Sequence, residues 1–234
     1  MSEHASGAET REFAERLHFD FVGMMFALAI GQAAVSLSDV IDARSGQHWP
    51  LIDCWPAFTH VLLVVLMIAA SWVSWGQSKS ARSQIASIWS RDFIELLIDV
   101  WIVICYFQIA RTVDGISGEA AFVPSAGEEA WWTMVVFVSY ATWDALTKLR
   151  SGQGDQYRQR GWASLTAAIL SVLVWRICGD CSTWGAVILA DVALVMLVLA
   201  FRAMKSADWS KQTPAQRRRW RLLSALSLLL ALVA

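Results

Sequence analysis

The segment between Arg91 and Arg111 most constrains what this chain can fold into. Its nineteen intervening residues, DFIELLIDVWIVICYFQIA, are enough for a helix to cross a hydrocarbon core of about 30 Å. They also carry Asp92, Glu95 and Asp99, and spacings of three and then four residues place these carboxylates on one helical face. Because an ionised group is costly in a bilayer, that face is expected to point into a bundle interior or a water-filled path. The segment therefore predicts a membrane protein with several spans and an internal acidic wall.

The rest of the chain extends this prediction to an all-α, polytopic transmembrane helical bundle. Hydrophobic residues make up 56% of the 234 residues and charged residues only 17%, below the roughly 25% of a soluble domain. A last apolar run, 222–234, is too short for a normal span and predicts a short C-terminal apolar helix. We expect an N-terminal tail over 1–17, a six-span bundle over 18–204 and a basic segment with the apolar helix over 205–234. The six spans are predicted at 18–40, 57–76, 92–110, 131–147, 162–177 and 183–201.

The distribution of Lys and Arg predicts the orientation. Sixteen of these residues fall before the first span and in the segments 77–91, 148–161 and 202–221, whereas the alternate loops hold three. By the positive-inside rule the N-terminus is cytoplasmic, in a multi-pass protein of the inner (plasma) membrane without a cleaved signal peptide. The formal net charge of −1 gives no indication of nucleic-acid binding.

Acidic residues within the predicted spans are candidates for an ion path. Glu95 and Asp99 fall in the cytoplasmic half of the third span, and Asp191 falls near the middle of the sixth. If these side chains face one another they would form a vestibule that attracts cations. Intramembrane ionisable residues favour such a functional role over a purely structural one.

The first span has a mildly polar stripe. Met25, Gln32 and Asp39 recur every seven residues. A pore-lining helix would show this pattern, and so would a helix packed against polar neighbours inside a bundle. The residues alone leave both interpretations open.

The four cysteines and the missing catalytic motifs favour a protein that is not an enzyme. Cys178 and Cys181 form a C-x-x-C in a predicted outer loop, which suits a local disulfide or two free thiols better than redox catalysis. No phosphate-binding loop, hydrolase motif or set of metal ligands with recognisable spacing is present, so we expect neither a cofactor nor a metal.

Four arginines precede the last apolar run. Clustered arginines beside a membrane segment suit anionic lipid headgroups, although topology signalling alone would also explain them. The lipid-headgroup candidates are Arg217, Arg218, Arg219 and Arg221.

The first three spans also carry a family resemblance, and the residues that match its motifs lie in the first two. Arg16 is followed by the run Phe21 to Ile30, FVGMMFALAI, and the second span contains Pro56, Phe58 and Trp72. These residues resemble the start of the TMEM175-type potassium channel family, whose first span opens with R-x-x-x-F-S-D-G-V-F-A-I-A and whose second resembles P-x-F followed by W-x-x-H-H. The match is to the hydrophobic half, Phe26 to Ala29; Val22, Gly23 and Met24 replace Ser-Asp-Gly, and Trp75 and Gly76 replace the histidines. The resemblance covers the first three spans.

The resemblance implies a function. In that family the first span lines the pore and apolar side chains form its constriction, which implies pore-lining roles here for Met25, Leu28 and Gln32. Our sequence-based hypothesis is therefore an oligomeric channel for monovalent cations, with potassium as the expected ion. The alternative is a non-enzymatic interaction or pore-forming effector subunit that works with a soluble cytoplasmic protein partner through its basic loops.

Overall fold

The described residues form six helices. The computed structural model describes residues 21–42, 54–77, 91–111, 125–151, 154–179 and 183–206. The first helix spans Phe21–Asp42. It is followed by α2 (Trp55–Gln77), α3 (Arg91–Ala110), α4 (Ala126–Ser151), α5 (Gly154–Cys178) and α6 (Trp184–Ser206).

Local sequence signals account for where the helices begin. Pro56 lies in the first turn of α2, where a missing backbone N–H costs nothing. Ser125 caps α4, because its side-chain oxygen accepts a hydrogen bond from the backbone N–H of Glu128 at 3.3 Å. Thr183 precedes α6, and its carbonyl accepts hydrogen bonds from the backbone N–H groups of Ala186 and Val187.

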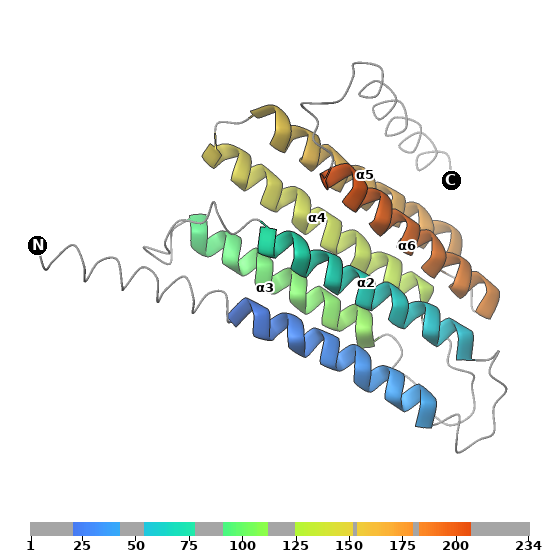
Figure 1. The fold of residues 1–234 in the computed structure, drawn as a ribbon. Coiled ribbons are helices and arrows are strands. Elements are labelled where there is room, and N and C mark those ends of the chain that lie inside the picture. The colour runs from blue at the N-terminus through green and yellow to red at the C-terminus, as the bar shows by residue number, and fades with distance from the viewer. Residues whose placement is uncertain are drawn as a thin grey trace, which may run out of the picture.

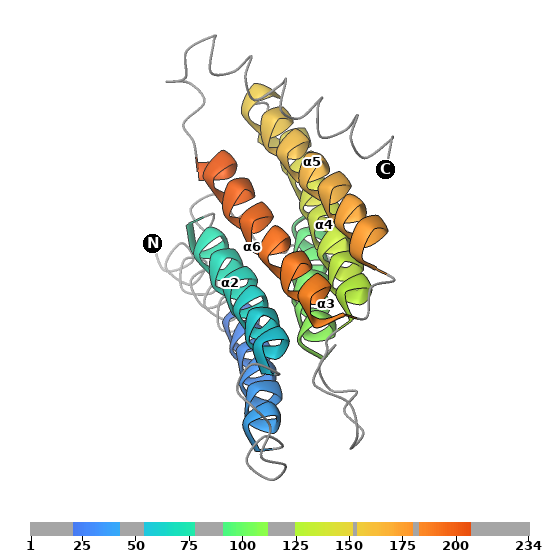
Figure 2. The same cartoon turned by 90° about the vertical axis from the view of Figure 1, so that its right-hand side faces the viewer.

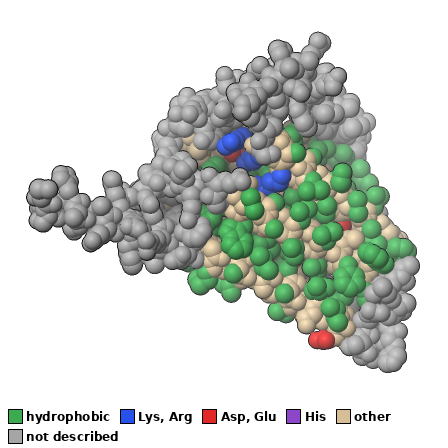
Figure 3. All heavy atoms as spheres, viewed as in Figure 1, with side chains coloured by type: hydrophobic (Ala, Val, Ile, Leu, Met, Phe, Trp, Pro, Cys, Tyr) green, Lys and Arg blue, Asp and Glu red, His purple; other side chains and the backbone are tan. Residues whose placement is uncertain are grey.

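The outer surface of the bundle is apolar, as expected for a multi-pass membrane protein. Five of the described helices are long and apolar enough to cross a membrane: the first helix, α2, α3, α5 and α6. Large hydrophobic side chains such as Leu62, Leu189 and Met196 are about 60% exposed. Figure 3 shows hydrophobic side chains spread over one face of the described helices. Such a surface suits lipid rather than water.

The fourth predicted span differs from its expected bounds. It was expected to begin at residue 131, but α4 begins at Ala126, and Glu129 therefore lies in its first turn instead of in a loop. α4 also lies outside the set of helices that are long and apolar enough to span a membrane, and its first turn holds Glu128 and Glu129. It nevertheless runs through the bundle beside α5 and α3 (Figure 1).

The helices alternate in direction around one core. Figures 1 and 2 show α6 beside α2 and α5, and α4 beside α5. The starts of α2, α4 and α6 lie together at one end of the bundle, because side chains near these starts contact one another. We call this the entry end, and the opposite end, where the same three helices finish, the exit end. The basic exit end is the one predicted to be cytoplasmic.

The first helix lies at the edge of the bundle against α2 and α3. Phe26, which is 4% exposed, packs its ring against Trp72 and Trp75 of α2 and Tyr106 of α3, with centroid distances of 6.4–6.5 Å. The buried hydroxyl of Ser36 donates a hydrogen bond at 3.2 Å to the carbonyl of Ala110, which ends α3. One apolar anchor and one polar contact thus hold this helix to the bundle.

We expect Phe26→Ala to lower the free energy of unfolding by about 3 kcal/mol. This value is at the low end of the range measured for removing a buried aromatic ring. Between lipid-embedded helices the variant loses packing contacts but little free energy of transfer from water. Phe21→Ala on the same helix is the control. Phe21 is 42% exposed, so this substitution should lower the free energy of unfolding by about 0.5 kcal/mol or less. Unfolding of the purified variants in mixed micelles with increasing dodecyl sulfate measures both free energies of unfolding. Equal decreases in the two variants would contradict the anchoring role of Phe26.

Candidate functional site: two buried polar clusters

Polar side chains are buried at two levels of the bundle, three helical turns apart. In α2 the two levels are marked by His60 and Ser71, in α4 by Glu129 and Tyr140, and in α6 by Asp191 and Arg202. The separation is eleven residues in all three helices. Eleven residues make slightly more than three full turns and rise about 16 Å, so both levels lie on the same face of each helix.

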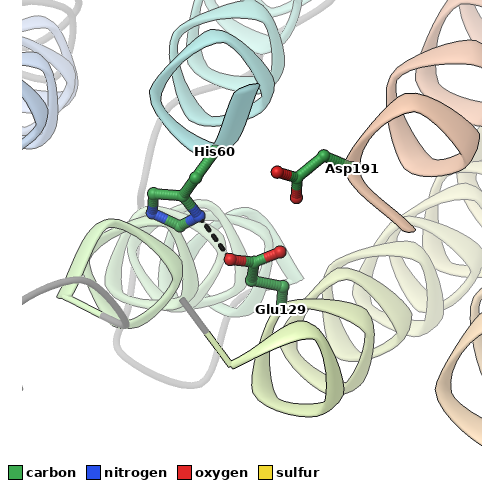
Figure 4. A group of neighbouring side chains, drawn as sticks. All are labelled: His60, Glu129 and Asp191. Carbon is green, nitrogen blue, oxygen red and sulfur yellow. Dashed lines mark ion pairs between the residues drawn. The ribbon is translucent and has the colours of Figure 1, made fainter. Parts of the chain in front are cut away.

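The cluster at the entry end consists of Thr59, His60, Glu129 and Asp191; we call it the carboxylate cluster. Nδ1 of His60 lies 2.6 Å from Oε1 of Glu129, and these two side chains are 1% and 0% exposed. The hydroxyl of Thr59 donates a hydrogen bond at 2.5 Å to Oδ2 of Asp191, which is fully buried. Figure 4 shows the carboxylate of Asp191 pointing from α6 toward the pair formed by α2 and α4. One imidazole and two carboxylates thus share a small volume inside the protein.

The start of α4 is held close to the end of α5, and this places Glu129 in the interior. A Cβ atom built on Gly127 would lie 3.0 Å from the carbonyl oxygen of Gly179, so the two backbones approach too closely for a larger residue without adjustment. Ser125 caps the same turn through its side chain, and its carbonyl accepts a hydrogen bond from the N–H of Glu129 at 3.0 Å. A glycine contact and a capped first turn therefore fix the direction of the Glu129 side chain.

The cluster toward the exit end is organised by Arg202; we call it the arginine cluster. The guanidinium donates hydrogen bonds to the hydroxyls of Ser71 (2.8 Å) and Tyr140 (3.1 Å), and also to Ser74. Tyr106 of α3 joins the cluster through its hydroxyl, 2.9 Å from that of Tyr140, and Ser71 contacts both tyrosines. Four helices are thus connected through one positively charged side chain.

An ion pair extends the arginine cluster to α5. Nζ of Lys205 lies 3.0 Å from Oδ2 of Asp144, which also accepts a hydrogen bond from the hydroxyl of Ser164 at 3.0 Å. The Lys205 ammonium lies 4.9 Å from the ring centre of Tyr140, which allows a cation–π contact. The sequence analysis did not assign Asp144, Lys205 or Arg202 to a site, and the structure connects all three.

An apolar layer separates the two clusters. It is built from buried side chains that lie between the two levels on α2, α4 and α6 and belong to one hydrophobic core. Thr133 of α4 is a buried polar residue within the layer, and its hydroxyl contacts Sδ of Met67. The main members of the layer are Leu63, Val64, Met67 and Ile68 of α2, Val136 and Phe137 of α4, and Leu194, Leu197 and Val198 of α6. Among the described residues, the bundle interior therefore offers no continuous polar route from one end to the other.

The three acidic ion-path candidates are not brought together. Asp191 belongs to the carboxylate cluster, whereas Asp99 accepts a hydrogen bond from Nε1 of Trp75 at 3.2 Å, near the end of α2. Thr59, which contacts Asp191, precedes Trp75 by sixteen residues, or about 24 Å along α2. Glu95 is 8% exposed and lies one turn before Asp99 on α3. Within one chain, Asp191 and Asp99 therefore lie on opposite sides of the apolar layer.

The pore-lining candidates all lie on the first helix. Leu28 is 53% exposed and Asp39 is exposed near the end of the helix. Met25 packs against the hydrophobic core, and Gln32 is partly buried at the middle of the helix. Leu28, Gln32 and Asp39 are four and then seven residues apart and so share one side of the helix.

The remaining candidates lie at or beyond the edge of the described residues. Cys178 is buried at the end of α5, but Cys181 lies outside the described residues, so the disulfide stays a prediction. The same holds for the lipid-headgroup candidates Arg217, Arg218, Arg219 and Arg221, for the tail 1–17 and for the apolar run 222–234.

The sequence analysis assigned neither His60 nor Glu129 of the carboxylate cluster to a site, and its fourth span began two residues after Glu129. The available signal was the recurrence of a polar pair eleven residues apart in α2, α4 and α6. Chemically, the cluster can hold a positively charged ion or protons, because it joins two carboxylates to an imidazole. The arginine cluster presents the opposite charge.

Comparisons with family models, with curated proteins and with solved structures found no match for this chain.

The Asp144–Lys205 pair provides a test of the buried network. We expect Asp144→Leu and Lys205→Met each to lower the free energy of unfolding by about 3 kcal/mol, because each leaves a charge without its partner inside the bundle. The double variant should recover most of this loss, since it removes both charges together. Dodecyl sulfate unfolding of the two single variants and the double variant gives the coupling energy. Losses that simply add would show that the two side chains do not stabilise each other.

Proposed function

We propose that this protein is the subunit of an oligomeric cation channel whose pore runs between copies and is lined by the first helix. The observation that carries the proposal is the position of Gln32, a partly exposed amide at the middle of a membrane-spanning helix. A polar group at this depth is costly against lipid and favours contact with water or with another copy of the chain.

The closed interior of the single bundle supports a pore between copies. The apolar layer blocks a polar route through the subunit, and Arg202 on the far side of that layer would repel a cation. A cation path is therefore more readily built outside the bundle, on the side where the first helix lies.

The exposed face of the first helix has the side chains that such a path requires. Leu28 is exposed one turn from Gln32 and would form an apolar constriction when several copies surround an axis. Gly31 is exposed with open space around it, which lets neighbouring helices approach closely. Asp39 and Asp42 are exposed at the helix end, where carboxylates raise the local concentration of cations. Potassium remains the expected ion, from the family resemblance of the first three spans.

We expect purified protein in liposomes to pass K⁺ without a partner protein. Leu28→Asn should raise the flux about tenfold, which corresponds to lowering the barrier by about 1.4 kcal/mol, because it hydrates the constriction. Gln32→Leu should reduce the flux by a similar factor, because it removes the polar group at the middle of the pore. Separate K⁺, Na⁺ and H⁺ gradients measure the selectivity.

Leu62→Asn on α2 is the matched control, since Leu62 is 59% exposed and does not belong to the first helix. Its flux should equal that of the unaltered protein. Unchanged flux in both first-helix variants would contradict the position of the pore. Absence of flux for every ion, with the protein folded and inserted, would overturn the channel.

A further inference from the structure

The carboxylate cluster has the donor atoms of a metal site. His60, Glu129 and Asp191 each offer one ligand atom, and the three atoms lie within 4.8 Å of one another. They come from three different helices, α2, α4 and α6, and all three residues are buried. Ligands held by separate rigid helices in a dry interior are a preorganised arrangement. The group is therefore more than a chance gathering of surface carboxylates.

Asp191 gives an independent indication that something is bound there. Its Oδ2 accepts the hydrogen bond from Thr59, but its buried Oδ1 has no hydrogen-bond partner among the described residues. Figure 4 shows this carboxylate directed at His60 and Glu129. Because a buried carboxylate oxygen without a partner is costly, an ion at this point would satisfy it.

In the part of the chain that the structure describes, Asp191 has no strongly basic side chain beside it that would compensate an ionised carboxylate at this position. It forms no ion pair with a Lys or Arg among the described residues. The basic residues of its own helix, Arg202 and Lys205, follow eleven and fourteen residues later, about 16 and 21 Å along the helix, and their contacts are with the exit end. A cation bound between Asp191 and Glu129 would supply positive charge at the place where the carboxylates are buried.

We infer that His60, Glu129 and Asp191 bind one divalent transition-metal ion, of which Zn²⁺ is the representative probe. An imidazole nitrogen combined with two carboxylate oxygens suits Zn²⁺, Fe²⁺ or Mn²⁺. Mg²⁺ and Ca²⁺ favour sites composed of oxygen atoms alone. The site lies inside one subunit, apart from the proposed pore between copies, so this inference goes beyond the channel and does not depend on it.

Binding requires the ligand atoms, which lie within 4.8 Å of one another, to adopt a common spacing around the ion. Two ligands that each lie about 2.1 Å from a tetrahedral ion are about 3.4 Å apart, whereas Nδ1 of His60 and Oε1 of Glu129 are 2.6 Å apart. The ion would replace their direct contact and separate them by about 0.8 Å. The ligands are the sixth, fourth and eighth residues of α2, α4 and α6, within about 12 Å of the helix starts. The cluster is therefore close to the entry end, from which an ion can reach it.

A metal titration of the full-length protein tests the site. The protein is purified in detergent, treated with a chelator, and titrated with Zn²⁺ in competition with a fluorescent chelator of known affinity. We expect one Zn²⁺ per chain, and at least tenfold weaker binding in Glu129→Gln, because a ligand is lost. Glu128→Gln is the matched control: Glu128 is the preceding residue, is exposed and lies outside the cluster, so its affinity should be unchanged.

Two further measurements test the metal site if Glu129→Gln folds poorly. Zn²⁺ should raise the melting temperature of the unaltered protein and of Glu128→Gln, because it binds the native state. The conservative variants Asp191→Asn and His60→Gln should lose that rise. Co²⁺ should give visible absorption bands in the unaltered protein that are absent from both variants.

Two results would overturn the metal site. Absence of stoichiometric Zn²⁺ binding would show that the cluster holds protons instead of a metal. Equal Zn²⁺ affinity in Glu128→Gln and Glu129→Gln would place the ion elsewhere on the chain, and either result overturns the site. Zn²⁺ binding by a protein that passes no cation would overturn the channel and leave the site, while K⁺ flux without Zn²⁺ binding would do the reverse.

Discussion

The structure depends on polar side chains satisfying one another across helices in an apolar bundle. Lipid offers no hydrogen-bond partner, so a buried hydroxyl, carboxylate or guanidinium must find one in its own helix or on a neighbouring helix. Arg202 does this through Ser71, Ser74 and Tyr140, and Asp144 does it through Ser164 and Lys205. These contacts specify which helix faces meet, a task that interchangeable Leu, Val and Ile side chains perform poorly. The apolar core then fills the space that the polar contacts define.

The eleven-residue spacing in α2, α4 and α6 gives this network its layered form. Because eleven residues return to almost the same side of a helix, a polar position at the entry end is aligned with one toward the exit end. The two levels carry opposite charge, with two carboxylates at one and Arg202 at the other, and a hydrophobic layer separates them. We propose that within a subunit this arrangement resists the passage of a cation and provides a place where one can bind. Conduction and cation binding are therefore best assigned to different surfaces of the chain.

Much of the fold could be predicted from the sequence, whereas the site could not. Helix positions follow from hydrophobic length, since a bilayer core requires a continuous apolar segment, and α2 and α3 lie within two residues of their predicted bounds. α6 ends five residues later than predicted, and α5 begins eight residues earlier. The start of α4 was predicted five residues late because two adjacent glutamates in an apolar context resemble a loop. Only the burial of Glu129 beside His60 shows that one of them points inward while Glu128 points outward.

The sequence by itself determined that this is an all-helical membrane protein, because hydrophobic length and the requirement for internal backbone hydrogen bonds leave no other class of structure for these segments. It also contained every polar residue of the two clusters. Tertiary structure alone decided which of them meet. Asp191 joins His60 and Glu129 instead of Asp99, since the partner of a side chain depends on helix rotation, direction and depth. Those quantities are set by packing between segments more than a hundred residues apart, such as Thr59 and Asp191, and no pattern within one segment encodes them.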